Sequence, residues 1–432
     1  MTLDRRAFLT VASAGSASTL TLGLAGCNLN SSGDTEDKSP IDYPNDPDAI
    51  EALYRDNIYT QLLGVRPHLP THEHVSRLGG GRMSEEVIAA MAQANEFFVD
   101  MHELMAAAGE RIAEITGAEA ALVTAGGFSA MVLGAAGCLT GTDPKRVHNL
   151  PHPTWDRTEC LIQTPHRFSY DRAYKDAGMT IVEAETRDEF AKKITERTAM
   201  IAALVTAERQ ALFAPPTPLH WAPAPGAEVM SVREQIKLGS DAGVPVLVDM
   251  ASDLPTRADL GEFIEAGADL VVISGGKGIG GPQSTGILAG RADLIEAARL
   301  NSSPNDGIGR GMKVGKEEIV GLIVALESYV ASNFDDWVDD WGKKAQTIAA
   351  KLQDVPGLTA EVVLNTAGYE DVEITWDPNV IPLTSDEAKA ELMSGEPRLA
   401  YLMTIRTRLL RDGEHALVAR HLHDFFTSAA GR

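Results

Sequence analysis

Short, almost wholly apolar runs recur through the middle of this 432-residue chain and constrain its fold more than any other feature. They lie at residues 120–123, 200–205, 245–249, 270–273 and 285–289, and stretches with helical periodicity separate them. A strand that is apolar at nearly every position is covered on both faces, and the helical stretches supply that cover. We therefore expect an α/β fold with a mostly parallel sheet and helices on both of its faces.

Helix signals frame these runs. Ser84 can cap a helix whose first turn contains Glu85 and Glu86, and a second helix is expected over residues 101–116, ended by Gly117. These features predict an N-terminal segment at 49–83 and a large α/β domain that begins at residue 84.

The pattern changes beyond residue 334. Residues 359–364, 371–376 and 399–405 have the pattern of antiparallel strands, and residues 413–426 that of a closing helix. We therefore expect the large domain to span 84–334 and a small α+β C-terminal domain to span 335–432.

The first 48 residues look like sorting signals. Arg5 and Arg6 precede a weakly apolar run without acidic residues, too short to span a membrane stably, as in a twin-arginine export signal. The run ends in Leu24-Ala25-Gly26-Cys27, which resembles a bacterial lipobox with Cys27 as the lipidated residue. We expect residues 1–26 to be a signal peptide, residues 27–48 a flexible tether, and the protein an exported lipoprotein on the periplasmic or outer cell face. A frayed helix with an incidental cysteine is the alternative.

The charge balance argues against a nucleic-acid partner. The chain has 38 Lys and Arg against 61 Asp and Glu, a formal charge of −23. Removal of residues 1–26 would leave −24, and no basic tract is present. We expect a small-molecule amino substrate, no nucleic acid, and membrane contact only through the N-terminal lipid.

The most specific chemistry follows two neighbouring apolar runs. Asp249 ends one run, and Ser274-Gly275-Gly276-Lys277 follows the end of the next. The carboxyl ends of neighbouring parallel strands share one edge, so both side chains can face one cavity. A lysine that forms an imine and an aspartate that keeps a pyridine nitrogen protonated are what pyridoxal phosphate requires, and Ser274 could bind its phosphate. Glycine-rich turns between a strand and a helix are common, so this pattern alone is a weak indication of the cofactor.

Four segments together resemble the selenium-transferase-like group of fold-type I pyridoxal-phosphate enzymes. This group includes seryl-tRNA selenium transferase and proteins similar to D-glucosaminate-6-phosphate ammonia-lyase. The segments are residues 78–84, 116–124, 274–283 and 308–318, and the resemblance extends from about residue 66 to the C-terminus. It implies pyridoxal 5′-phosphate as the cofactor, Lys277 as its covalent attachment point, Asp249 at the pyridine nitrogen, and a homodimer or higher homo-oligomer.

The resemblance also implies the rest of the cofactor site. Thr124, Ala125, Gly126 and Gly127 open a helix whose backbone N–H groups should hold the phosphate. Ser252 is expected beside the cofactor ring. His166 falls in the region that packs against the face of the cofactor, and a surface position is the alternative.

Two arginines next to glycine-rich turns are candidates for substrate binding. Arg82 ends one such turn, and Arg310, with Lys313, lies in another. Because glycine neighbours offer an arginine stem little to pack against, we expect Arg82 and Arg310 to bind a carboxylate or phosphate of the substrate. Solvated basic residues beside a turn are the alternative.

The implied activity is that of a lyase that eliminates across Cα–Cβ of a small amino acid or amino sugar acid. Gly276 stands where the selenium transferases have an aspartate, which resembles the ammonia-lyase side of the group. An aminotransferase, a racemase or a transferase similar to seryl-tRNA selenium transferase would share the first steps. A binding protein that keeps the fold without turnover also remains open.

Three histidines, His68, His72 and His74, form a separate candidate cluster. They could be read as metal ligands, but a well-placed fourth ligand is missing and prolines interrupt their loop. We predict no metal site.

Overall fold

The computed structural model describes residues 43–213, 223–224, 226–253, 260–365, 367–400 and 404–431. The expected signal peptide, Cys27 and the tether up to residue 42 lie outside this part of the chain. Within it, no helix is long and apolar enough to cross a membrane.

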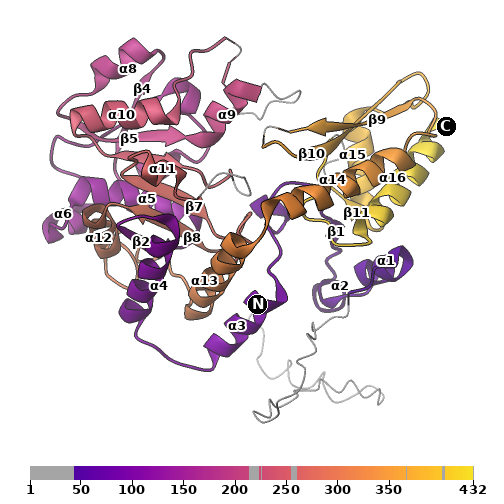
Figure 1. Ribbon diagram of the computed structural model, residues 1–432, viewed down its shortest axis with the longest axis horizontal. Coiled ribbons are helices and arrows are strands. Elements are labelled where there is room, and N and C mark those ends of the chain that lie inside the picture. The colour runs from indigo at the N-terminus through magenta and orange to yellow at the C-terminus, as the bar shows by residue number, and fades with distance from the viewer. Residues whose placement is uncertain are drawn as a thin grey trace, which may run out of the picture. The chain divides into compact units, whose positions relative to one another are not determined.

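A seven-stranded sheet forms the centre of the larger lobe (Figure 1). Its order is β2-β8-β7-β6-β5-β3-β4, and among these described strands only β8 runs antiparallel to its neighbours. The strands are β2 (Ala120–Thr124), β3 (Glu159–Gln163), β4 (Thr180–Ala184), β5 (Thr198–Leu204), β6 (Val246–Asp249), β7 (Leu270–Ser274) and β8 (Gly286–Gly290). The prediction of a mostly parallel α/β sheet is confirmed, with the ends of the expected strands shifted by at most two residues.

Helices cover both faces of this sheet. A Cβ placed on Gly134 of α5 (Gly126–Thr140) would lie 2.7 Å from Leu247, whereas one on Gly239 of α10 (Val232–Ala242) would lie 2.2 Å from Val246. Successive side chains of a strand point to opposite faces, so these two helices pack on opposite sides. The other helices of the lobe are α3 (Glu85–Asn95), α4 (Met101–Thr116), α6 (Pro144–Asn149), α7 (Arg172–Asp176), α8 (Arg187–Lys193), α9 (Val205–Phe213), α11 (Glu262–Glu265), α12 (Ala292–Asn301) and α13 (Lys316–Ala331).

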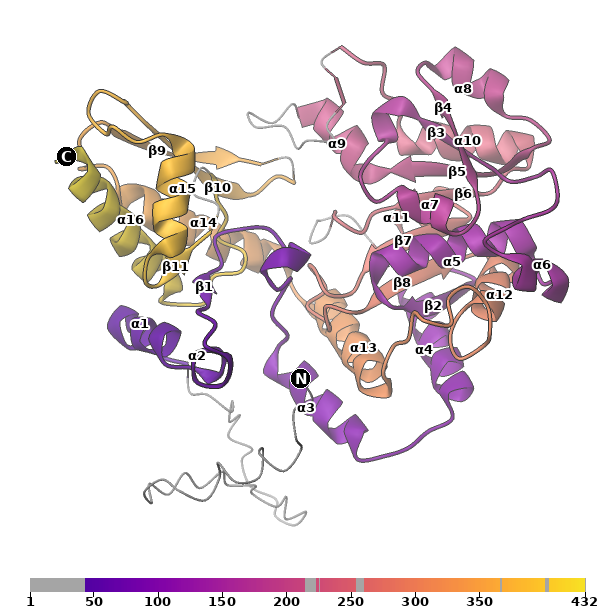
Figure 2. The ribbon, with the colours of Figure 1, turned by 180° about the vertical axis from the view of Figure 1, so that it is seen from behind.

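The smaller lobe is an α+β unit with a hydrophobic core of its own (Figure 2). Strands β9 (Leu358–Leu364), β10 (Glu370–Trp376) and β12 (Thr404–Ile405) form an antiparallel sheet. Helices α14 (Phe334–Lys351), α15 (Ser385–Ser394) and α16 (Glu414–Ala430) accompany it. The strand expected at 399–405 is instead two short strands, β11 (Arg398–Leu399) and β12.

The N-terminal segment joins the smaller lobe. Its strand β1 (His68–Leu69) pairs in parallel with β11, and Ile50 of α1 (Pro47–Arg55) is part of that lobe's core. A further helix, α2, spans Ile58–Leu63. The tether was expected to extend to residue 48, but the described chain is already packed at Tyr43, whose hydroxyl donates to Glu414 at 2.6 Å.

The local reason for this difference lies at the start of α1. The side chain of Asp46 accepts hydrogen bonds from the backbone of residues 48 and 49, and Pro47 occupies the first helical position. Asp46 and Pro47 therefore begin a helix. They do not belong to a flexible tether.

Candidate active site

Lys277 and Asp249 lie at the same edge of the sheet. Asp249 is the last residue of β6, where it pairs with Val272 of β7, and Lys277 is three residues beyond the end of β7. The Nζ atom of Lys277 donates a hydrogen bond to Oγ of Ser252 at 2.9 Å. The structure therefore brings together three of the predicted site residues.

Charge and burial act against each other at this edge. Asp249 is 4% exposed, and its Oδ1 accepts a hydrogen bond from the backbone N–H of Ala251 at 2.9 Å. Burial raises the pKa of Asp249, while the hydrogen bond from Ala251 and the charge of Lys277 oppose that rise. Burial lowers the pKa of Lys277, opposed by the carboxylates of Asp249, Asp253 and Glu73. A lysine with a lowered pKa is more often neutral and hence a better nucleophile.

The N-terminus of α5 is a suitable site for a phosphate group. Its N-cap, Ala125, has no side chain that could bond the first backbone N–H groups. Gly126 has φ +83°, and a Cβ on Gly127 would lie 3.1 Å from Cβ of Ala251, so this helix end packs against the loop that follows Asp249. An uncapped helix N-terminus offers N–H donors and a favourable dipole to an anion.

Thr124 and Ser274 flank this helix end. Both lie opposite Gly286, so the ends of β2, β8 and β7 place them in one row. Ser274 is 9% exposed, whereas the hydroxyl of Thr124 donates to the carbonyl of Gly126 at 3.1 Å. Lysine, buried aspartate, serine and uncapped helix end thus form a donor set that fits pyridoxal phosphate.

His166 is buried, so the alternative of a surface histidine is wrong. It is 1% exposed, its Nδ1 accepts from the backbone N–H of Leu204 at 3.0 Å, and its Nε2 lies 2.9 Å from the carbonyl oxygen of Met230. Burial lowers the pKa of His166 to about 4, although both backbone hydrogen bonds oppose this. The ring is held neutral near the end of β5, and its contact with a cofactor stays a prediction.

The guanidinium of Arg82 is paired with Glu414, a partner that the sequence prediction did not foresee, and its role in substrate binding stays a prediction. Its Nη1 and Nη2 atoms donate to the two carboxylate oxygens of Glu414 at 3.0 and 2.7 Å, and Nη1 also donates to the carbonyl of Leu409 at 3.1 Å. Glu414 is fully buried and opens α16. The glycine turn before Arg82 gives its side chain nothing to pack against, but the start of the C-terminal helix provides a contact. Arg82 and Glu414 are 332 residues apart, so the local sequence cannot reveal this contact.

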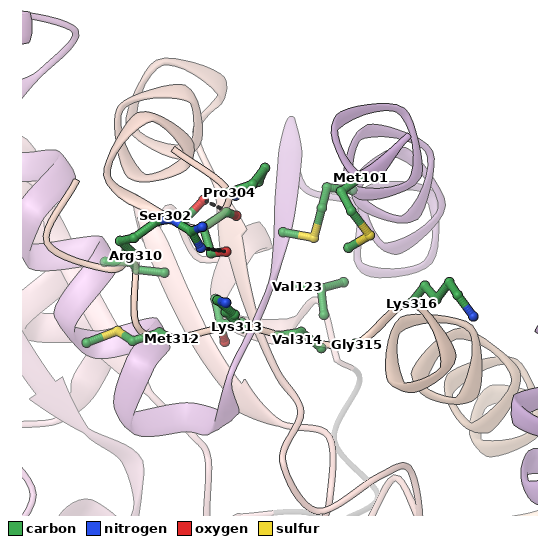
Figure 3. A pocket seen from close by; sticks show the side chains of 14 residues that line it. Met101, Val123, Ser302, Pro304, Arg310, Met312, Lys313, Val314, Gly315 and Lys316 are labelled. Atoms are coloured by element: carbon green, nitrogen blue, oxygen red, sulfur yellow. Dashed lines mark hydrogen bonds between the residues drawn. The ribbon is translucent and has the colours of Figure 1, made fainter. Parts of the chain in front are cut away.

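Arg310 lines a cavity of about 260 Å³ that also includes Thr124. Figure 3 shows Arg310 reaching a serine hydroxyl, Lys313 near the middle of the cavity, and Lys316 pointing away from it. The serine is Ser303, at 3.4 Å from Nη1 of Arg310, and Arg310 is about half exposed. Arg310 therefore remains a candidate for binding an anion.

The three N-terminal histidines do not converge on one point. Nε2 of His68 and Nε2 of His72 lie 2.9 Å apart, which is a hydrogen bond between two imidazoles. The ring of His74 lies beside Gly81, where a Cβ would be 3.1 Å from its Cδ2. Among the described residues no group of three or more His, Cys, Asp or Glu is arranged to hold a metal.

Sequence reasoning missed Asp253. This carboxylate is 6% exposed, its Oδ2 accepts from the hydroxyl of Thr206 at 3.1 Å, and its Oδ1 lies 3.1 Å from Nη1 of Arg209. Burial raises the pKa of Asp253 to about 6, opposed by the charge of Arg209. Its position four residues after Asp249, in the same loop as Ser252, was the only available signal.

A second missed group faces the lysine from the smaller lobe. Glu73 contacts both Arg406 and Arg408, and Arg408 is also stacked on Tyr369. Two arginines spaced two residues apart after an apolar strand were visible in the sequence, because side chains at that spacing share one face. Their partner Glu73, over 330 residues away, was not.

A parallel sheet whose edge holds a buried aspartate, a lysine and an uncapped helix N-terminus defines the class of fold-type I pyridoxal-phosphate enzymes. Comparison with known proteins agrees with this class. The family model described as L-seryl-tRNA selenium transferase matches residues 174–337.

Two curated relatives and one solved structure match most of the chain. A 5′-C-glycyluridine monooxygenase-decarboxylase from Streptomyces sp. is 32% identical over 382 residues, 83% of this chain and 90% of the relative. A D-glucosaminate-6-phosphate ammonia lyase from Salmonella typhimurium is 26% identical over 393 residues, 87% of this chain and 99% of the relative. The structure of a D-glucosaminate-6-phosphate ammonia-lyase superposes with a TM-score of 0.74 at 25% identity, over 87% of this chain and 99% of that one.

The chain belongs to the same family of pyridoxal-phosphate-dependent enzymes as the 5′-C-glycyluridine monooxygenase-decarboxylase, and part of it, residues 174–337, matches the selenium transferase model. The predictions of fold, of an enzyme and of a lyase-like or transferase activity in this family are confirmed. The predicted roles of individual residues and the export signals stay predictions.

Proposed function

We propose that the chain binds pyridoxal 5′-phosphate covalently at Lys277 and acts as a lyase on a small amino acid or amino sugar acid. The observation that carries the proposal is the placement of Lys277, Ser252 and Asp249 at one sheet edge, beside the uncapped N-terminus of α5. Asp249 would hold the proton on the pyridine nitrogen, and the backbone of Gly126 and Gly127 would hold the phosphate. Ser274 would add a hydroxyl to the phosphate, and His166 would lie against the ring.

Bound pyridoxal phosphate supplies an electron-withdrawing ring that stabilises negative charge at Cα of an amino substrate. Lys277 would move the proton at that Cα, because burial lowers the pKa of its amine and so increases the neutral fraction that can accept a proton. Ser252 orients Nζ of Lys277 through the 2.9 Å hydrogen bond. A leaving group at Cβ then departs, which completes an elimination.

The substrate's negative charge has two candidate binding sites now that Arg82 is assigned to Glu414. Arg406 and Arg408 share Glu73, whose neighbour His74 lies beside the Gly276–Lys277 turn, so we assign the substrate carboxylate to them. Arg310 with Lys313, in the cavity beside Thr124, would bind a second anionic group such as a phosphate.

A substrate panel tests this function. The purified protein, loaded with pyridoxal phosphate, is mixed with D- and L-serine, threonine, cysteine and D-glucosaminate, and the release of ammonia and 2-oxo acid is measured. The proposal expects release with at least one hydroxy- or thio-substituted substrate and none with Lys277→Ala. Amino-group transfer to an added 2-oxo acid in place of ammonia release would favour the aminotransferase alternative.

The Streptomyces relative supports a second candidate, oxidative decarboxylation of an amino acid. That relative has higher identity to this chain than the ammonia lyase does, and both cover most of it. Oxygen uptake with release of CO2 from a 1-carboxyl-labelled substrate would identify this reaction. Ammonia release without oxygen uptake would exclude it.

We also propose that the protein is a homo-oligomer in which a second copy covers an apolar surface of the N-terminal third. Of thirteen exposed large apolar side chains among the described residues, five lie in residues 58–65 and four in residues 88–99. Phe98 of the second group is 98% exposed and lies near Lys316, one of the residues around the Arg310 cavity. Related enzymes of this family often oligomerise, so a second copy is the partner that fits this surface.

The export of the protein is a further proposal, based on Arg5, Arg6 and the segment that ends at Cys27. It predicts a lipoprotein exported by the twin-arginine route and anchored by a lipid on Cys27. Replacement of both arginines by lysine should leave the precursor in the cytoplasm, and Cys27→Ser should leave it without lipid. A mature protein that begins at another residue would contradict the lipoprotein assignment.

A further inference from the structure

Glu73 is the shared ligand of two arginines in the smaller lobe. Its Oε1 lies 2.8 Å from Nε of Arg406 and also accepts a hydrogen bond from Nη2 of Arg408. Arg408 is 6% exposed at its side chain and is fixed from another side by Tyr369, whose hydroxyl accepts from Nη1 at 2.5 Å. One carboxylate oxygen thus serves two guanidinium groups.

The arginine pair does not use all of its hydrogen-bonding capacity. Two carboxylates, those of Glu73 and Asp371, lie beside the two guanidinium groups. Asp371 lies 3.5 Å from Arg406, and burial raises the pKa of Asp371 while the charges of Arg408 and Arg406 oppose that rise. The Nε atoms of both arginines are buried without a well-directed hydrogen-bond acceptor among the described residues. Guanidinium forks bind carboxylates in pairs of hydrogen bonds, and this arrangement uses only part of that capacity.

Glu73 stays ionised in this position. Burial alone would raise its pKa, but the charges of Arg408 and Arg406 outweigh this and hold the pKa of Glu73 at about 2. The side chain of Glu73 is 36% exposed and that of Arg406 26%, so solvent reaches the carboxylate that pairs with the two arginines. Glu73 therefore contacts the two arginines in the way that the carboxylate of a bound ligand would.

The segment that contains Glu73 also packs against the lysine turn. A Cβ placed on Gly81 would lie 3.1 Å from the ring of His74. The same Cβ would lie 3.2 Å from the carbonyl oxygen of Gly276, so Gly81 lies between the two. The charge of Glu73 contributes to the pKa of Lys277, and that of Lys277 to the pKa of His74. The arginine pair and its glutamate therefore belong to the surroundings of Lys277.

We propose that Glu73 is an internal competitor that fills the carboxylate site on Arg406 and Arg408 until a substrate displaces it. The inference rests on the proposed function, which assigns these two arginines to the substrate carboxylate. Glu73 then determines which ligands bind to the two arginines. A ligand with only a carboxylate gains little binding free energy when it replaces the carboxylate of Glu73. An amino acid that is also held through its amino group at Lys277 gains enough to displace Glu73.

The test measures the binding of propionate, a carboxylate without an amino group, to the full chain loaded with pyridoxal phosphate, by calorimetry. Glu73→Gln removes the competing charge, so propionate should bind about tenfold more tightly than to the unaltered protein. The matched control is Glu183→Gln, which removes a glutamate paired with Arg167 on the surface of the larger lobe and should leave propionate affinity unchanged. If Glu73→Gln does not fold, Glu73→Asp, which keeps the charge on a shorter stem, should also bind propionate more tightly than the unaltered protein.

The outcomes separate the two proposals. A glutamate that only fixes the arginines would make Glu73→Gln bind propionate equally or more weakly, and this result would overturn the competitor role. Arg406→Met, made in the Glu73→Gln background, tests the site itself. Loss of the gained affinity supports the arginine pair as the carboxylate site, whereas unchanged affinity contradicts that part of the proposed function.

Discussion

At the scale of single residues, His166 shows how burial fixes a protonation state. Its two ring nitrogens are hydrogen-bonded to backbone atoms and its pKa is lowered to about 4. Between pH 6.5 and 4 the unfolded chain therefore binds a proton at this residue that the folded chain does not. The contribution of His166 to the free energy of unfolding is fully present above pH 6.5 and decreases as the pH falls below that value.

We expect that lowering the pH from 7 to 5 costs about 2 kcal/mol of unfolding free energy through His166. Denaturant unfolding at both pH values measures it, and His166→Gln should show a smaller loss between the two pH values than the unaltered protein. An identical loss in both proteins would contradict the neutral, buried state of this ring.

Asp253 gives a second prediction at this scale. Its charge raises the pKa of Lys277, so Asp253→Asn should lower that pKa, while an amide oxygen can still accept from Thr206. The rate of Lys277 carbamylation by cyanate, followed by peptide mass in the cofactor-free protein across pH, measures the shift. An unchanged pH profile would mean that Asp253 does not affect the pKa of Lys277 and only holds α9 in place through Thr206 and Arg209.

The residue scale also shows where sequence reasoning ended. Lys277 and Asp249 could be predicted because each follows an apolar run, and parallel strands bring their ends to one edge. The pairing of Arg82 with Glu414 and that of Glu73 with Arg408 were missed for one reason: the partners lie over 330 residues away in the sequence, although the fold brings them into the same lobe. No local pattern encodes such pairs.

At the scale of elements, the start of α16 joins the N-terminal segment to the smaller lobe. Glu414 accepts hydrogen bonds from the hydroxyls of Tyr43 and Tyr54 and from Arg82, and its carboxylate lies at the helix N-terminus, where negative charge is favoured. Burial alone would raise the pKa of Glu414. The hydrogen bonds and the charge of Arg82 outweigh burial, so the pKa of Glu414 is lowered.

We expect Glu414→Gln to lower the unfolding free energy by about 3 kcal/mol, the lower end for a broken buried pair, because Arg82 is partly exposed. Glu114→Gln is the matched control, since that glutamate pairs with Arg111 on the surface, and it should cost less than about 0.5 kcal/mol. Denaturant unfolding measures both. Similar losses in the two variants would mean that the Arg82–Glu414 contact does not stabilise the fold.

Elements with strong local signals were predicted well. Ser84 caps α3 as expected, and Gly117 ends α4 in the left-handed conformation. The strand expected over 399–405 is described only at its two ends, which pair with different partners, β1 and β10, and residues 401–403 between them lie outside the described part of the chain.

Close helix–sheet packing gives a further prediction for these elements. A Cβ on Gly239 would lie 2.2 Å from Val246, so Gly239→Ala should separate α10 from β6 and cost about 1–3 kcal/mol of unfolding free energy. Gly311→Ala is the control, because nothing lies within 4 Å of that position. Equal stability of the two variants would contradict the packing of α10 on this face.

At the scale of the whole molecule, the proposed oligomer depends on the exposed apolar residues at 88–99. Phe98→Asp should shift the protein toward the monomer in light scattering, because a charge replaces an aromatic ring buried by the second copy. Leu364→Asp, at a side chain that is 72% exposed on β9 of the smaller lobe, should leave the mass unchanged. A monomeric unaltered protein, or loss of assembly only in Leu364→Asp, would contradict this surface.

The attachment of pyridoxal phosphate at Lys277 is the central claim, and peptide mass analysis after borohydride reduction tests it most directly. The purified protein should show a visible absorbance band that reduction abolishes, and its tryptic digest should contain one pyridoxyl-modified peptide, with the modification on Lys277. Lys277→Ala should yield none, and Asp249→Ala should keep some cofactor but lose turnover, since the ring nitrogen is then less often protonated. A modified lysine elsewhere, or an unmodified Lys277 in protein saturated with pyridoxal phosphate, would contradict the account.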